Sequence, residues 1–254
     1  AKKFIFDDIE YFEIPNKELN YNTLIINLKF ICFSNNTFKK LQDIFNINHI
    51  AINNLYCSSY IRSANYNLIF ENYKKKIFLD IGFRKSTICV YYQDKLILLK
   101  NIPVGGDHIT NDIAKIFKIE KEYSEKIKKK LNESNSIFSD NSEVNLNNEY
   151  IDKKISLDLL NKVIYARIDE ILNLSFKDID LLKLIGNKNN SILIFTGQGS
   201  KILNKNSIYL KEEFDYFSEI NFFEETTKSI CESGLNFTKT INDSEVNVVP
   251  KRLK

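Results

Sequence analysis

The segment 76–106 constrains the fold more than any other part of the chain. An apolar strand at 76–82 ends on an acidic residue and a glycine, and two further strand-like runs follow at 86–92 and 95–101. Strands joined by such short turns predict an antiparallel meander. A Pro-Val-Gly-Gly break comes next, and Asp107 is then the expected N-cap of a helix.

The chain beyond this segment alternates helical and strand-like patterns. Apolar residues at helical spacing predict helices at 123–131, 157–182 and 223–237. The run 132–148 is rich in Asn, Ser and acidic residues and predicts a mobile loop. A buried strand is expected at 191–195, leading into the glycine-rich turn Thr196-Gly197-Gln198-Gly199-Ser200.

Residues 1–72 are predicted to form a small α/β unit of their own. Strands are expected at 24–33 and 50–55, and helices begin at Asn36 and at Ser58. The second helix has its apolar positions at Tyr60, Ile61, Ala64 and Leu68. We therefore expect two domains, 1–72 and 73–254.

The composition excludes several classes of function. With 36 basic and 33 acidic residues the net charge is +3, which gives no reason to expect nucleic acid as a partner. The four cysteines contain no CxxC pair, so we expect them to be reduced and mostly buried, as in a cytoplasmic protein. Only two histidines are present, which argues against a His-rich metal site. The sequence shows neither a signal peptide nor an apolar run of the roughly 20 residues that span a bilayer.

Three segments are candidates for binding an anionic ligand. In 80–87, a strand end and hairpin, backbone N–H groups and hydroxyls can face an anion, and Asp80 can hold the water shell of Mg²⁺. Gly105-Gly106 precedes a helix, whose N-terminus favours phosphate. In 196–200, glycines let a flat ring lie on the backbone. Each segment alone is more often a structural turn, but their order and spacing together are much more specific.

That order resembles one family. The run IFLDIGFRKSTICVYYQDKLILLKNIPVGGDHITNDIA resembles the second phosphate-binding segment of the actin-like cell-division protein FtsA, in which a strand leads into DIGGGTT, a hairpin and IPxGGxxITNDIA. Further along, 124–128 resembles the family's AExxK helix, 166–172 its arginine-acidic helix, and 191–200 its adenosine segment. The matches are collinear over 76–200, and GGDHITNDIA is the most specific because it separates FtsA from actin, sugar kinases and chaperone ATPases.

The resemblance implies an actin-like (ribonuclease H-like) α/β fold. A nucleotide-binding second lobe would occupy 73–254, preceded by part of the FtsA insertion domain at 1–72. ATP and Mg²⁺ are the implied ligands. The residues carried over for the phosphates and Mg²⁺ are Asp80, Gly82, Lys85, Ser86, Thr87, Gly105 and Gly106, and Asp80 is the one assigned to the metal. Those carried over for the adenosine are Glu125, Lys128, Gly197, Gln198, Gly199 and Ser200.

The chain departs from the family at two levels. Phe83 and Arg84 stand where the family has two glycines, and Gln198 replaces another; glycines permit positive φ and close backbone approach. Either Arg84 or Lys85 supplies charge to a phosphate instead, or this loop binds nucleotide poorly. In addition, we find no first phosphate segment before residue 75 and no C-terminal amphipathic helix. We therefore expect a chain without the first lobe, either as a partial sequence or as a naturally shortened protein.

The implied function is that of a scaffold. FtsA-like proteins bind ATP, polymerise, link FtsZ to the inner membrane and recruit later division proteins, at the cytoplasmic face of the membrane and the division site. Membrane contact would come only through the family's C-terminal helix. Two alternatives stay open: an ATPase or sugar-kinase-like enzyme of the same fold, or another actin-like scaffold for pilus assembly or cell shape. Beyond Asp80 no catalytic carboxylate is evident, so the expected activity is at most a weak ATPase.

Overall fold

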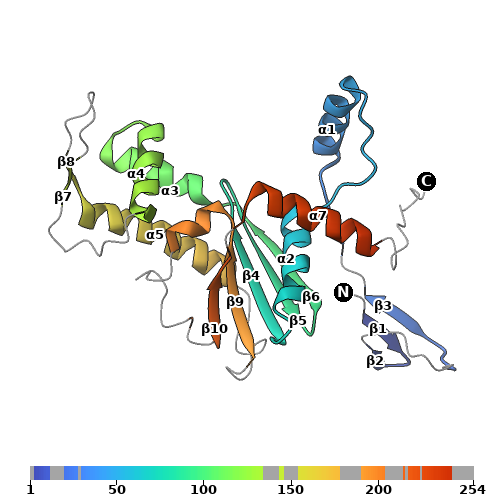
Figure 1. Ribbon diagram of the computed structural model, residues 1–254. Helices are drawn as coiled ribbons and strands as arrows, with labels where there is room; N and C mark the ends of the chain where they lie inside the picture. Colours follow the sequence, from blue (N-terminus) through green and yellow to red (C-terminus); the bar gives the residue numbers. More distant parts are fainter. Residues whose placement is uncertain are drawn as a thin grey trace.

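A mixed five-stranded sheet forms the centre of the molecule (Figure 1). The computed structural model describes residues 3–11, 20–27, 30–133, 143–145, 154–177, 190–203, 214, 217–223 and 225–241. In the order β10-β9-β4-β5-β6, the strands are β10 (Glu219–Phe222), β9 (Ser191–Thr196), β4 (Lys75–Ile81), β5 (Ser86–Tyr92) and β6 (Lys95–Ile102). β4, β5 and β6 are antiparallel, whereas β9 runs parallel to β4 and β10 parallel to β9. The predicted meander and the predicted strand at 191–195 are confirmed.

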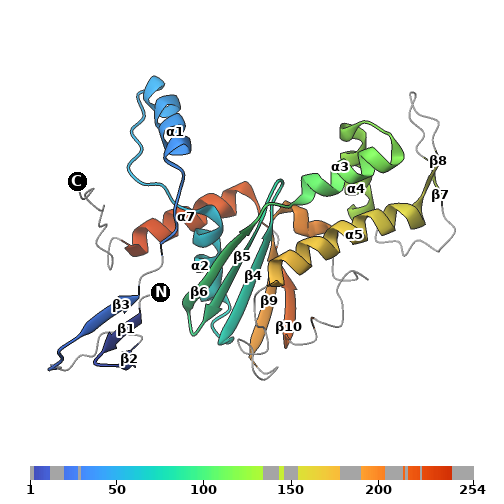
Figure 2. The same cartoon turned by 180° about the vertical axis from the view of Figure 1, so that it is seen from behind.

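Helices cover both faces of this sheet, as Figure 2 shows from behind. On one face lies α5 (Leu157–Phe176), which packs against β5, β6 and α3 (Gly106–Phe117). α4 (Lys121–Glu133) packs on α3. On the other face lie α2 (Ser58–Ile69) and α7 (Thr227–Ile241), which contact each other. Because the sheet is covered on both sides, its inner strands are apolar runs, and every residue of β9 is buried.

The two faces of β4 belong to two different hydrophobic clusters. Ile77, Leu79 and Ile81 pack in the larger cluster together with residues of α5. Phe78 packs in the smaller cluster together with Tyr66 of α2. Side chains of a strand alternate between its faces, so Asp80 lies on the α2 face of the sheet.

Two helices begin at a different residue from the one predicted. α3 begins at Gly106 and its N-cap is Gly105, so Asp107 is inside the first turn and is not the cap. α7 begins only at Thr227, where the sequence predicted a start near 223. Its start is fixed by Thr226, whose Oγ1 accepts from Ser229 N at 3.1 Å while Ser229 Oγ accepts from Thr226 N at 2.9 Å.

The middle of the chain agrees with the prediction in part. The helix predicted at 123–131 is α4, and α5 begins at Leu157 as expected but ends at Phe176. Residues 178–182 of the predicted helix, and most of the predicted loop 132–148, lie outside the described residues. Within that loop β7 (Glu143–Asn145) pairs with β8 (Lys154–Ser156), so this part of it is a strand.

The N-terminal segment differs most from the prediction. β1 (Lys3–Phe6) pairs with both β2 (Ile9–Tyr11) and β3 (Leu24–Asn27) to form a separate antiparallel sheet. Of the strand predicted at 24–33, residues 24–27 form β3 and residues 30–33 have no regular structure, so the prediction is wrong for 30–33; residues 28 and 29 lie outside the described residues. The strand predicted at 50–55 is wrong, since 50–57 adopt no regular structure. α1 (Asn35–Ile47) matches the helix predicted from Asn36.

The helix predicted from Ser58 is present, and its buried face agrees with the predicted one only in part: Ile61 is buried as expected. Leu68 is 59% exposed, whereas Arg62 and Tyr66 are buried. Because α2 packs on the central sheet, its contacts favour a domain boundary before Ser58; the division after residue 72 stays a prediction. The expectation of mostly buried cysteines is wrong: Cys89 is buried, but Cys32 and Cys231 are exposed. In the described part of the chain, no helix is long and apolar enough to cross a membrane.

Candidate nucleotide-binding site

The three glycine-containing segments predicted from the sequence meet at one edge of the sheet. β4 and β9 are parallel neighbours in which Asp80 pairs with Thr196, so the turns that follow both strands leave the same edge. A Cβ added at Gly199 would lie 2.6 Å from Ile81 Cγ2, and one added at Gly105 would lie 2.6 Å from Gly82 O. Only residues without a side chain allow the backbones to approach this closely. The segments are therefore in direct contact.

The hairpin between β4 and β5 is tied to the start of α3. Gly82 N donates to Lys85 O at 3.0 Å and closes the turn. Gly106 N donates to Gly82 O at 2.9 Å, and Asp107 N donates to Phe83 O at 2.7 Å. The first two amides of α3 are thus used within the protein, which limits what this helix end offers to a phosphate.

Phe83 and Arg84 fit the hairpin without backbone strain. Neither has a positive φ, in contrast to what glycines at these positions would permit. Both side chains are exposed at the tip, and the Lys121 ammonium lies 6.0 Å from the centre of the Phe83 ring. The substitution of two family glycines is therefore accommodated by an ordinary turn.

The hydroxyls of Ser86 and Thr87 point into the protein. Ser86 Oγ donates to Val104 O at 2.7 Å, and Thr87 Oγ1 donates to Asn101 Oδ1 at 2.9 Å. Both residues are buried. They join β5 to β6 and to the segment before α3, and their direct contact with a phosphate stays a prediction.

Two residues of α4 predicted for the adenosine lie beside Gly106. Lys128 Nζ donates to Gly106 O at 3.1 Å, to Thr110 Oγ1 at 2.7 Å and to Glu125 Oε2 at 2.6 Å. Burial by itself raises the pKa of Glu125, but hydrogen bonds from Lys128 and Thr110 outweigh it and leave the pKa below its ordinary value. Glu125 is therefore a carboxylate with its charge balanced by Lys128.

The turn after β9 is held by its own hydrogen bonds. Ser200 Oγ donates to Gly197 O at 2.7 Å, and a short 3-10 helix, η1 (Gln198–Leu203), follows. Gly197 has a φ of 85°. A Cβ added at Gly106 would lie 3.6 Å from the Cα of Gly199, so this turn faces the start of α3. All four predicted residues of the turn, 197–200, are thus at the same edge as Gly106 and Lys128.

A buried charge network lies behind this edge, under α2. Asp80 is paired with Arg62 and accepts from Ser59 Oγ at 2.9 Å. Arg62 is also paired with Glu225, which accepts from Tyr66 Oη at 2.9 Å and from Gly197 N at 3.1 Å. Burial lowers the pKa of the Arg62 guanidinium, but the two carboxylates outweigh it and raise the pKa above its ordinary value.

Comparison with known proteins decides the family. Residues 77–238 match the family described as "Cell division protein FtsA", which is more than half of the chain. The chain belongs to the FtsA family. No curated protein sequence matches it.

Solved structures confirm the fold of this FtsA-family chain. MreB5 of Spiroplasma citri bound to AMPPNP is similar with a TM-score of 0.61 and 17% identity, over 83% of this chain and 66% of that one. The PilM-PilN type IV pilus biogenesis complex is similar with a TM-score of 0.53 and 13% identity, over 93% of this chain and 63% of that one. The chain thus spans about two thirds of the length of these structures. At such low identity the likeness shows the fold alone, and the predicted actin-like α/β lobe is confirmed.

The surroundings of Asp80 do not suit the Mg²⁺ that the FtsA resemblance implies. The groups that contact this carboxylate are a guanidinium and a hydroxyl donor, whereas Mg²⁺ requires oxygen acceptors and several waters around it. Among the described residues, no three acidic, His or Cys side chains gather where they could hold a metal ion. Asp80 therefore has a protein cation as its partner.

The network around Asp80 in this FtsA-family chain was not predicted from the sequence. Asp80 contacts Ser59 and Arg62 of α2, and Arg62 also pairs with Glu225, just before α7. The one available signal was an arginine within a helix that has apolar residues at helical spacing. It carried no indication of its partners, because Glu225 lies 163 residues away in the sequence.

Proposed function

We propose that the chain is the nucleotide-binding part of an actin-like cell-division scaffold and that it binds the adenosine of ATP or ADP. The observation that carries the proposal is the meeting of the hairpin, the start of α3 and the turn after β9 at one sheet edge, beside Lys128 and Glu125. Ligands of open α/β sheets bind outside the carboxyl ends of their strands, which is where these segments lie. MreB5, which shares the fold, has been crystallised with AMPPNP and with ADP.

The proposed contacts divide into two sets. Gly106, Gly197 and Gly199 would form a backbone floor for the base. Gly106 would be its open position, because the space beside the other two glycines is filled by Asp80 and Ile81. Glu125 and Lys128 would give up part of the hydrogen bonding between them and bond the ribose hydroxyls instead. Phosphate contacts would come from the exposed side chains of Arg84 and Lys85, because the amides of Gly106 and Asp107 are already bonded to the hairpin.

The partners proposed for the whole protein follow from family membership. A scaffold of this family would self-associate into polymers, bind FtsZ and recruit later division proteins at the cytoplasmic face of the inner membrane. Co-sedimentation of the chain with FtsZ polymers from the same organism tests the first of these contacts. If the chain does not co-sediment with FtsZ either with or without ADP, this part of the protein does not bind FtsZ.

Calorimetric titration of ADP into the chain tests the nucleotide proposal. The most informative variant is Gly106→Ala, because its new Cβ has no protein atom closer than 3.6 Å and should not disturb the fold. We expect it to weaken ADP binding by about tenfold or more, since the methyl group occupies the floor that glycine leaves open. Lys128→Met should weaken binding similarly.

Gly234→Ala is the matched control. Gly234 lies in α7, and a Cβ there would meet nothing within 4 Å. This variant should bind ADP as the unaltered chain does. The proposal is contradicted if the two alanine variants bind ADP equally well, or if the unaltered chain binds none.

A further inference from the structure

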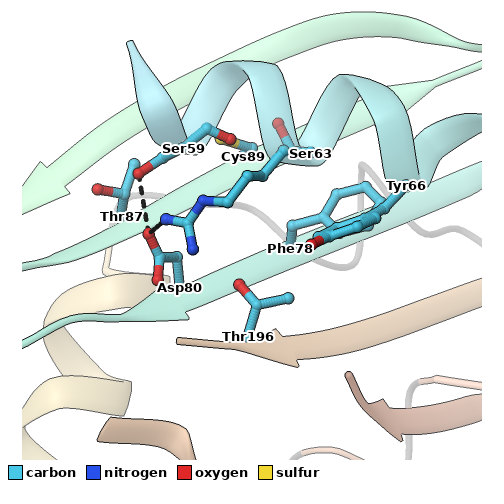
Figure 3. Close-up of a pocket in the computed structure, with 9 residues that line it drawn as sticks. Ser59, Ser63, Tyr66, Phe78, Asp80, Thr87, Cys89 and Thr196 are labelled. Carbon is cyan, nitrogen blue, oxygen red and sulfur yellow. Dashed lines mark hydrogen bonds and ion pairs between the residues drawn. The ribbon is translucent and has the colours of Figure 1, made fainter. Parts of the chain in front are cut away.

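Arg62 occupies the place beside Asp80 where a cation is expected. It comes from α2, on the face of the sheet opposite α5, and only 8% of the residue is exposed. A small pocket under α2 is lined by Arg62 together with Asp80, Thr87 and Thr196. Figure 3 shows Asp80 and Thr196 at its base, with a dashed line joining Ser59 to Asp80.

One guanidinium is shared by two carboxylates in this network. Arg62 pairs through one terminal nitrogen with Asp80 and through the other with Glu225. The remaining contacts of the carboxylates are also donors: Ser59 Oγ to Asp80, and Tyr66 Oη and Gly197 N to Glu225. The two acids are thus held close together by a positive charge that belongs to the protein.

Such an arrangement leaves no role for a metal ion at Asp80. A divalent cation would have to displace a guanidinium that is buried and bonded on both sides, and Mg²⁺ gives up its own water reluctantly. We propose that Arg62 acts as a built-in cation at Asp80, excludes divalent metal from this carboxylate, and makes nucleotide binding independent of Mg²⁺. The last part rests on the proposed function, whereas the exclusion of metal does not.

The exclusion of metal can be tested without nucleotide. Mn²⁺ is titrated into the purified chain and the bound fraction is followed by electron paramagnetic resonance. We expect the unaltered chain and Asp80→Asn to give the same titration, because Asp80 holds no metal while Arg62 is in place. A Mn²⁺ site in the unaltered chain that is lost in Asp80→Asn would overturn the proposal.

Removal of the guanidinium should convert the network into a metal site. In Arg62→Gln two buried carboxylates remain side by side without a counter-charge, so Mn²⁺ should bind about tenfold more tightly or better. The gain should disappear in the double variant Arg62→Gln/Asp80→Asn. Arg62→Lys retains a positive charge, should remain folded, and should show no gain; a gain in this variant equal to that in Arg62→Gln would count against the proposal.

The nucleotide arm compares ADP affinity in Mg²⁺ with ADP affinity in EDTA. The unaltered chain should bind ADP equally well in both, and so should Arg167→Gln. Arg167 is a matched control because it also lies between two carboxylates, Asp112 and Glu170, but joins α5 to α3 and is not among the residues proposed for the nucleotide. Binding that is lost in EDTA would refute metal-independent binding.

The two arms separate the two proposals. If no ADP binds under either condition while the Mn²⁺ titrations of the unaltered chain and Asp80→Asn coincide, the proposed nucleotide function fails and the exclusion of metal at Asp80 stands. If ADP binds only with Mg²⁺ and Asp80→Asn abolishes the metal effect, the nucleotide function stands and the inference on Arg62 fails.

Discussion

Gly197 is the residue whose replacement tests the packing of the candidate site most directly. Its φ of 85° is in the left-handed region, where a side chain costs about 1–2 kcal/mol. A Cβ at this position would also lie 2.4 Å from Asp80 Oδ1 and 2.6 Å from Ile81 O, well inside contact distance. Relief of this clash requires both Asp80 and the backbone of Ile81 to move, and complete loss of the buried pair of Asp80 with Arg62 would cost about 3–5 kcal/mol.

We therefore expect Gly197→Ala to lower the free energy of unfolding by about 2–4 kcal/mol, the sum of the backbone cost and a partial loss of the ion pair. Urea unfolding, followed by circular dichroism, measures this difference. Tyrosine fluorescence is the second probe, since the chain has 13 tyrosines and no tryptophan. The melting temperature should fall by about 2–4 °C for each kcal/mol.

Gly234→Ala provides the comparison for this measurement. Gly234 is inside α7 with nothing near its missing Cβ, so alanine should raise stability by about 0.5–1 kcal/mol through helix propensity. If Gly197→Ala is as stable as the unaltered chain, the turn after β9 is not held against Asp80, and the reasoning about the candidate site is refuted.

Three further predictions concern side chains. Arg62→Met should cost about 3–5 kcal/mol in urea unfolding because it leaves two buried carboxylates unpaired, whereas Arg167→Met, in a more exposed pair, should cost about 1 kcal/mol or less. Burial raises the pKa of Cys89 to about 12, so a thiol reagent at neutral pH should modify the exposed cysteines and reach Cys89 only in urea. Burial tends to raise the pKa of Asp107, but Lys121 outweighs it and leaves the pKa below the ordinary 3.8. The stability that this ion pair contributes is therefore present above pH 3.8 and is lost as the pH falls through the pKa of the folded state. Asp107→Asn should therefore show a smaller acid-side fall in urea midpoint than the unaltered chain.

The strands of the central sheet were predictable because their signals are local. Each of β4, β5 and β6 is a run of apolar and β-branched residues closed by a turn, and the antiparallel pairing follows from the short connections. The glycine segments were likewise predicted to act together. Their contact depends on the parallel pairing of β9 with β4, which the spacing of the segments along the chain does not indicate.

The partners of Asp80 could not be predicted because they are brought together by tertiary structure. Periodicity assigned Leu68 to the buried face of α2, whereas the packing of α2 on the sheet and on α7 turns Arg62 and Tyr66 inward. Burial of this arginine is tolerated because two carboxylates pair with it: Asp80 and, from the far end of the chain, Glu225.

The two halves of the candidate site differ in how much of their bonding is available to a ligand. On the phosphate side, Ser86, Thr87 and the first amides of α3 are all bonded within the protein. On the adenosine side, the glycine backbones meet beside a pair of charged residues on α4 that can exchange hydrogen bonds with hydroxyls. Arg62 also neutralises the charge of Asp80, so this carboxylate already has a cation beside it and needs no metal ion. The geometry therefore supports the proposed recognition of the nucleoside more than recognition of its phosphates, as expected for the proposed scaffold.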